Sequence, residues 1–129
     1  MIATQTYLQQ SIQTAGPAHL VLALYDGLLA SIRRAQHALS SDQLGATEQA
    51  HVELVRGQRI VSELQVGLNH EQGGDIASSL DSLYTYCMNE LLEANLRKEP
   101  AGLEAVQRII RVLRDSWDEA CCSTQHATQ

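Results

Sequence analysis

Glu48 and His51 come closest to a metal site in type and spacing, because they stand three positions apart in a stretch with helical periodicity. In bundle proteins with a di-metal centre, two Glu-x-x-His pairs and two further glutamates face the core. No other histidine in this sequence has a glutamate three residues before it, and the pair flanks the inward position Ala50 instead of occupying it. The sequence therefore predicts no metal site. A metal-dependent bundle oxidase is an alternative that elemental analysis would detect.

The remaining residue patterns do not point to catalysis or to a bound cofactor. The sequence contains no glycine-rich phosphate loop, no nucleophile elbow and no cysteine-based zinc pattern. Arg108, Arg111 and Arg114 are spaced as a stripe on one helix, yet each has an acidic residue four positions away. This spacing favours a salt-bridged outer face over a basic partner site. We expect no cofactor and no enzyme activity.

Length and composition narrow the class of protein further. A chain of 129 residues is long enough for one domain with its own core. The formal net charge is −6, basic residues are interspersed among acidic ones and Phe is absent, which disfavours nucleic acid as a partner. No apolar run reaches the roughly 18 to 20 residues that span a bilayer, and the start of the chain lacks the signal-peptide pattern. We expect a cytoplasmic protein without membrane insertion, and three cysteines that form no disulfide framework.

Apolar residues recur every three or four positions in four stretches, which is typical of packed antiparallel helices. We expect helices over residues 17–39, 42–68, 75–98 and 100–122. Pro17 and Pro100 would open the first and the last, and Asp42 would cap the second. Residues 69–74 would form a turn in which Gly73 and Gly74 permit positive φ.

Matched helix lengths and short turns predict an all-α protein, an antiparallel up-down-up-down four-helix bundle over residues 17–122. A short N-terminal segment, residues 1–16, would precede the bundle, and a flexible tail, residues 123–129, would follow it. The inward seam consists of Val21, Tyr25, Leu28, Ile32, Ala35, Leu39, Ala50, Leu54, Val61, Leu64, Leu68, Ala77, Leu80, Tyr84, Cys87, Leu91, Ala94, Leu103, Val106, Ile110, Leu113, Trp117 and Ala120.

The chain has more helix-spaced apolar residues than one bundle core needs. Those outside the seam are Leu20, Leu22, Leu24, Leu29, Val55, Ile60, Val66, Ile76, Leu83, Met88, Leu92, Ile109 and Val112. Because each helix of a bundle touches two neighbours, some of these belong to a wider core. The rest form a surface for a partner or for a second copy of the chain.

Two polar positions inside the helices need an explanation. Asp26-Gly27 interrupts an apolar run, where Gly costs about 1 kcal/mol relative to Ala. Close helix packing at Gly27 and a role in partner binding are both open interpretations. For Asn95, beside the seam residue Ala94, a structural polar cluster is favoured over contact with a ligand backbone.

A set of short motifs resembles, in order and spacing, the flagellar secretion chaperone family that binds flagellin. The motifs are Tyr7, Thr14-Ala15-Gly16-Pro17, Leu20, Leu24-Tyr25-Asp26-Gly27, Ile60-Val61-Ser62-Glu63-Leu64, the turn at Leu68, Gly73-Gly74-Asp75-Ile76-Ala77, Leu83-Tyr84-Thr85-Tyr86, Leu91-Leu92-Glu93-Ala94-Asn95 and Trp117. The resemblance covers about residues 7 to 120.

This resemblance implies a non-enzymatic four-helix bundle that binds the C-terminal region of newly made flagellin in the cytoplasm. Such a protein prevents premature polymerisation and delivers flagellin to the flagellar type III export apparatus. In this family the client wraps around the bundle and lays helical pieces into apolar grooves, which suits anchors at i, i+3, i+4 and i+7. The leading segment covers part of that surface in the free protein.

The candidate partner-binding residues combine the apolar surplus with the family landmarks: Leu20, Leu22, Leu24, Tyr25, Ile60, Leu64, Leu83, Tyr84, Leu91 and Asn95. Tyr7 and Ile12 are the candidate residues of an N-terminal cap. We expect a monomer or a weak homodimer when the chain is free. The alternative is a structural, self-associating bundle without a client.

Overall fold

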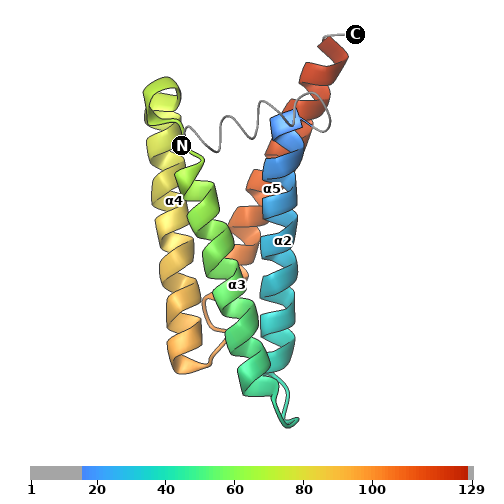
Figure 1. Cartoon of the computed structure of the whole chain (residues 1–129), viewed down its shortest axis with the longest axis vertical. Helices are drawn as coiled ribbons and strands as arrows, with labels where there is room; N and C mark the ends of the chain where they lie inside the picture. Colours follow the sequence, from blue (N-terminus) through green and yellow to red (C-terminus); the bar gives the residue numbers. More distant parts are fainter. Residues whose placement is uncertain (1–15, 128–129) are drawn as a thin grey trace.

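The computed structural model describes the backbone of residues 16 to 127 and the side chains from His19 to Cys121. This part of the chain forms four helices and no strand (Figure 1). The helices are α2 (Gly16–Leu39), α3 (Ala46–Val66), α4 (His70–Arg97) and α5 (Leu103–Ala127). Consecutive helices run in opposite directions (Figure 1), so the predicted all-α antiparallel bundle is confirmed.

The helices form a ring in which α3 lies between α2 and α4, and α5 closes the ring against α2 (Figure 1). Contact is most extensive between α2 and α3 and least extensive between α4 and α5. The fourth side of the ring is therefore the loosest.

At the C-terminal end of the predicted seam, Ala120 is exposed, so its placement in the core is wrong. The core consists largely of the other seam residues and also includes Leu29, which was predicted to lie outside the seam. Its largest fully buried side chains include Leu28, Ile32, Leu54, Leu91 and Ile110, contributed by all four helices. The prediction that Trp117 belongs to this core is wrong, because its side chain is 36% exposed. A physical reason lies in the ring itself, since α4 gives α5 much less cover than α3 gives α2.

The starts of α3 and α5 lie a few residues after the predicted ones. Asp42 does not cap α3; the N-cap is Gly45, with a left-handed φ of 85° and no side-chain cap. Pro100 precedes α5 and accepts a turn hydrogen bond from the Leu103 amide at 3.0 Å. In both cases the connection uses more residues than periodicity indicates, because the chain must first reverse its direction.

The start of α4 differs from the predicted turn over residues 69–74. Asn69 is the N-cap, and its side-chain oxygen accepts from the Gln72 amide at 3.1 Å. One helical turn follows before Gly74, whose φ of 51° and ψ of −122° interrupt the helix. The predicted positive φ is confirmed at Gly74, where residues other than glycine are disfavoured.

At the other end of the chain, α5 continues five residues past the predicted Cys122, to Ala127. The division into an N-terminal segment, a bundle and a tail stays a prediction. Among the described residues, no helix combines the length and apolarity that a bilayer span requires.

Candidate binding surface

Four of the predicted partner-binding residues lie inside the bundle. Tyr25, Leu64, Tyr84 and Leu91 are each at most 5% exposed and belong to one buried cluster. A partner could reach them only if the helices separated. We therefore exclude these four from the candidate surface and assign them to the seam, where periodicity also places them.

The two buried tyrosines form a polar pair across the bundle, between α2 and α4. Their hydroxyl oxygens are 2.7 Å apart. Burial raises the pKa of both phenols, because the charged phenolate loses hydration inside the protein. Burial also raises the pKa of the nearby Cys87 thiol to about 11. The two phenols and the thiol are therefore neutral at physiological pH.

Three of the remaining candidates, Leu20, Leu24 and Ile60, share the junction of α2 and α3. Leu24 and Ile60 are partly buried and pack against the core cluster. A Cβ added at Gly27 would lie 3.4 Å from Cδ1 of Ile60, so Gly27 faces α3. Leu20 and Leu24 precede Gly27 by seven and three positions and therefore lie on the same side of α2. We call Leu20, Leu24 and Ile60 the α2–α3 surface.

Leu22 and Leu83 do not belong to this surface. Leu22 is two positions from both Leu20 and Leu24, so it projects from a different side of the helix. Leu83 lies on α4 and is 36% exposed, and α4 is a neighbour of α3 and α5 rather than of α2. The predicted residues thus mark more than one face of the bundle.

Several exposed apolar side chains were missed by the sequence reasoning. They are Leu44 in the α2–α3 connection, Val52 on α3, and Leu96 on α4, which is 81% exposed. The available signal was their position away from the seam, because an apolar residue there has no neighbouring helix to cover it.

Asn95 is held in a polar cluster between α3 and α4. Its side-chain nitrogen lies 3.0 Å from Nδ1 of His51, and its side-chain oxygen accepts from Lys98 Nζ at 2.8 Å. This arrangement uses both ends of the Asn95 amide when His51 accepts at Nδ1. The finding supports the structural interpretation of Asn95, while a role in partner binding stays a prediction.

Asp26 and Gly27 both contact neighbouring helices. Asp26 Oδ1 lies 2.9 Å from Arg114 Nε of α5, and Arg114 also lies 3.7 Å from Asp118 one turn later. Because Gly27 has no Cβ, the Ile60 side chain of α3 packs close to the α2 backbone; an added Cβ would contact that side chain. Close packing against α3 therefore explains the glycine inside α2. Arg114 belongs to a salt-bridged face, as its spacing predicts.

Glu53 is a buried carboxylate that the sequence reasoning did not identify. Its side chain is 3% exposed and contacts Arg34 of α2 at 3.1 Å and Arg56 of α3 at 2.9 Å. Gln49 also donates a hydrogen bond to Glu53 at 3.0 Å. Because both arginines are half exposed, the cluster joins α2 to α3 at its edge and has the character of a structural ion pair.

The fold and these contacts define an antiparallel four-helix bundle that joins its helices through the Tyr25–Tyr84 pair and the Glu53 ion pairs and presents apolar side chains on several outer faces. The chain belongs to the FliS family of flagellar secretion chaperones, because the model of the family described as "Flagellar protein FliS" matches residues 1–124.

Similar proteins agree with this assignment. The flagellar secretion chaperone FliS of Bacillus subtilis is 32% identical over 114 residues, which cover 88% of this chain and 82% of the relative. FliS of Salmonella typhimurium is 30% identical over 116 residues, covering 89% and 84% of the two chains. A solved structure titled "Crystal structure of flagellar chaperone from bacteria" has the same fold, with a TM-score of 0.77, 24% identity and coverage of 95% and 98%.

Proposed function

We propose that this protein is a cytoplasmic export chaperone that binds the C-terminal region of flagellin. It would prevent premature polymerisation and deliver flagellin to the flagellar type III export apparatus. Membership of the FliS family is the observation that carries this proposal. The apolar side chains on several outer faces support it, because a client kept unfolded until assembly presents amphipathic segments that need such cover.

The client surface we propose contains the α2–α3 surface together with Leu22 and Leu83. Coupled folding costs a disordered client roughly 2 to 5 kcal/mol of its gross interaction energy, so an extended contact is required rather than one pocket. Residues on α2, α3 and α4 supply such a contact.

Native mass spectrometry of the chain mixed with a flagellin C-terminal peptide tests the proposal. We expect a 1:1 complex at tens of micromolar, and no complex with a flagellin N-terminal peptide of equal length. Leu83→Ser should weaken the complex at least about tenfold, the loss for about 1.4 kcal/mol. Leu96→Ser, a matched change at an exposed leucine of the same helix outside the proposed surface, should leave it unchanged. Absence of any complex would refute flagellin as the client of this protein.

Self-association remains the competing explanation of the apolar faces. Sedimentation of the free chain distinguishes the two, because a concentration-independent dimer or tetramer that persists with the flagellin peptide would favour a structural oligomer. A monomer or weak dimer that the peptide dissociates would favour the chaperone.

The proposed cap residues Tyr7 and Ile12 lie outside the described part of the chain. If residues 1–15 cover client surface in the free protein, only the molecules with an uncovered surface can bind the client. The apparent affinity is then the intrinsic affinity multiplied by the uncovered fraction of molecules. Removal of residues 1–15 should then strengthen peptide binding or leave it unchanged. A large loss would mean that this segment contacts the client directly.

A further inference from the structure

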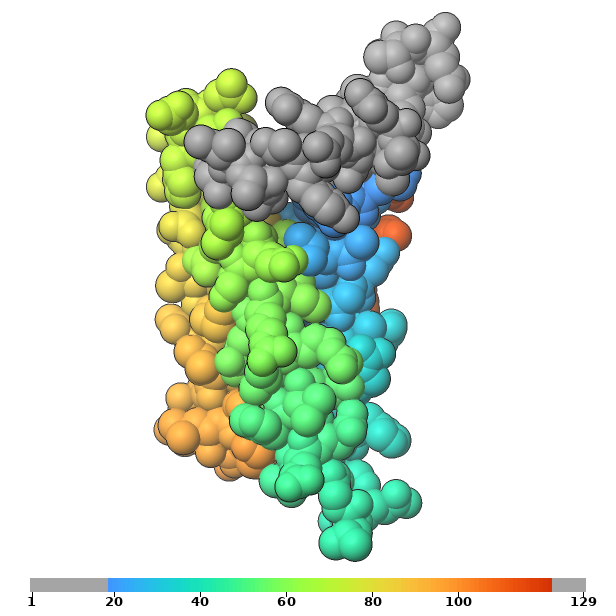
Figure 2. Space-filling view, viewed as in Figure 1, coloured from blue at the N-terminus to red at the C-terminus, as the bar shows by residue number. Residues whose placement is uncertain are grey.

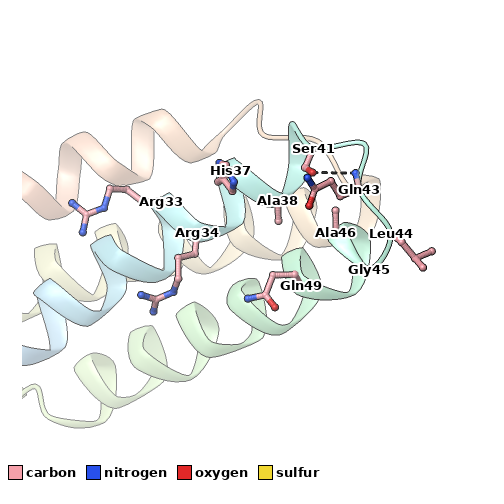
Figure 3. Close-up of a pocket in the computed structure, with 10 residues that line it drawn as sticks. All are labelled: Arg33, Arg34, His37, Ala38, Ser41, Gln43, Leu44, Gly45, Ala46 and Gln49. Atoms are coloured by element: carbon pink, nitrogen blue, oxygen red, sulfur yellow. Dashed lines mark hydrogen bonds between the residues drawn. The ribbon is translucent and has the colours of Figure 1, made fainter.

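A hollow lies at the tip of the bundle where α2 connects to α3 (Figure 3). Its volume is about 500 Å³, within the usual range of ligand clefts. Its walls come from the last turns of α2, the connecting loop and the first turn of α3. The connection forms one end of the molecule in Figure 2.

The hollow carries positive charge on a chain whose net charge is −6. Arg33, Arg34 and His37 line it, and none of the described side chains in its walls is acidic. Arg34 shares the buried Glu53 with Arg56, whereas neither Arg33 nor His37 forms an ion pair with a described residue. Asp42 and Glu48 are near in sequence but are not among the lining residues.

The start of α3 adds to this positive potential. Gly45 and Ala46 line the hollow, and the N-cap residue Gly45 supplies no side chain to accept from the first-turn amides. A helix N-terminus without a side-chain cap favours negative charge through its amide groups and its dipole. Because Glu53 already engages Arg34, the charge that favours a carboxylate comes from Arg33, with the imidazole of His37 and the N-terminus of α3 beside it; Glu48 in the first turn of α3 offsets part of the dipole at that helix end.

Apolar atoms accompany the charge. Leu44 is fully exposed and extends away from the bundle at the tip of the loop (Figure 3), and Ala38 and Ala46 contribute to the walls. A free phosphate or another small anion would leave Leu44 without a contact. A peptide with an apolar side chain beside acidic ones would cover it.

We propose that the basic hollow between the end of α2 and the start of α3 binds an acidic, amphipathic segment of a second protein. Arg33 and His37 follow Leu24 by 9 and 13 residues, so these parts of the hollow lie about 14 to 20 Å along α2 from the α2–α3 surface. This distance leaves room for the second protein and the flagellin client to bind together. The hollow would provide a contact that does not compete with the client.

Fluorescence anisotropy with synthetic peptides tests this site on the full chain. The probe is a labelled helical peptide with leucines at i and i+4 flanked by glutamates; a control peptide replaces each glutamate by lysine. We expect the acidic peptide to bind at least about tenfold more tightly than the basic one. Addition of the flagellin peptide should leave this binding unchanged. Loss of the acidic probe on addition of the flagellin peptide would overturn the independence of the two sites.

Substitutions locate the site. Arg33→Glu should weaken acidic-peptide binding at least about tenfold, and Leu44→Ser several-fold. Arg111→Glu, the same charge change at an exposed site on α5, should have less than about a twofold effect. Equal losses from Arg33→Glu and Arg111→Glu would overturn the site in favour of general attraction. Two results would overturn a peptide as the occupant of the hollow. One is complete displacement of the acidic peptide by inorganic phosphate, and the other is acidic-peptide binding that Leu44→Ser does not change.

Discussion

The hydroxyl oxygens of Tyr25 and Tyr84 lie 2.7 Å apart and join α2 to α4 across the centre of the bundle. Each phenol is the hydrogen-bond partner of the other, and both residues are only 2% exposed. Removal of one hydroxyl leaves the other buried without its partner, which costs more than the net contribution of the bond.

We expect Tyr84→Phe to lower the free energy of unfolding by about 1 to 3 kcal/mol. The double variant Tyr25→Phe with Tyr84→Phe should be less destabilised than the sum of the single variants, because both polar groups then leave the core together. Urea unfolding of the four proteins measures this coupling. Strictly additive effects would show that the hydroxyl pair makes no direct contribution.

Alkaline pH should destabilise the fold through Cys87. Its pKa is raised from 9.0 to about 11 by burial, so above pH 9 the unfolded chain loses this proton while the folded chain retains it. The free energy of unfolding therefore keeps its full value below pH 9 and falls by about 1.4 kcal/mol per pH unit between pH 9 and pH 11. Above pH 10, the raised pKa values of Tyr25 and Tyr84 add to the decline.

Urea midpoints measured between pH 8 and pH 10 separate the thiol from the phenols. Cys87→Ala should have a lower midpoint at pH 8, since it loses a buried group, but a flatter decline between pH 9 and pH 10. An unchanged slope in this variant would contradict the assignment to Cys87.

The two glycines at helix contacts should respond differently to alanine. An added Cβ at Gly27 meets only Cδ1 of Ile60, at 3.4 Å, so the better helix propensity should raise stability by about 0.5 to 1 kcal/mol. At Gly57 the added atom meets Leu28 at 3.3 Å and Leu91 at 3.5 Å, both fully buried, so crowding should cancel the gain.

The melting temperatures of Gly27→Ala and Gly57→Ala test this difference in stability. A second measurement is the affinity of Gly27→Ala for the flagellin peptide. Unchanged affinity would support the packing explanation of Gly27. Lost affinity in a stable variant would show that the client requires close approach at this position.

Glu53→Gln should destabilise the junction of α2 and α3 by about 1 to 3 kcal/mol. The substitution removes the negative charge that Arg34 and Arg56 contact, and it places an NH2 group among hydrogen-bond donors, so at least one of Arg56 and Gln49 can lose its acceptor. Glu48→Gln, at an exposed position of the same helix, is the matched control and should change stability by less than about 0.5 kcal/mol. Chemical denaturation of both variants gives the comparison, and equal effects would refute a special role for the buried carboxylate.

Periodicity predicts the four helices and most of the seam, because one inward residue per turn suffices to define a buried stripe. It cannot separate Leu29, which is buried, from Leu83, which is exposed, because both lie outside the predicted seam and only their helix neighbours differ. The N-cap at Gly45 and the bend at Gly74 depend on how the chain reverses direction, which periodicity does not report. Glu53 was missed because its burial depends on an arginine from another helix.

The limited contact between α4 and α5 has a consequence for local unfolding. Opening the ring on this side breaks fewer tertiary contacts than separating α2 from α3, so it is the sub-global opening of lowest free energy. Such an opening would let water reach the inner face of α4, where Leu91 and Cys87 are otherwise fully buried. Amide protons near this junction would exchange before those between α2 and α3, and the α2–α3 hairpin would be the last part of the bundle to unfold.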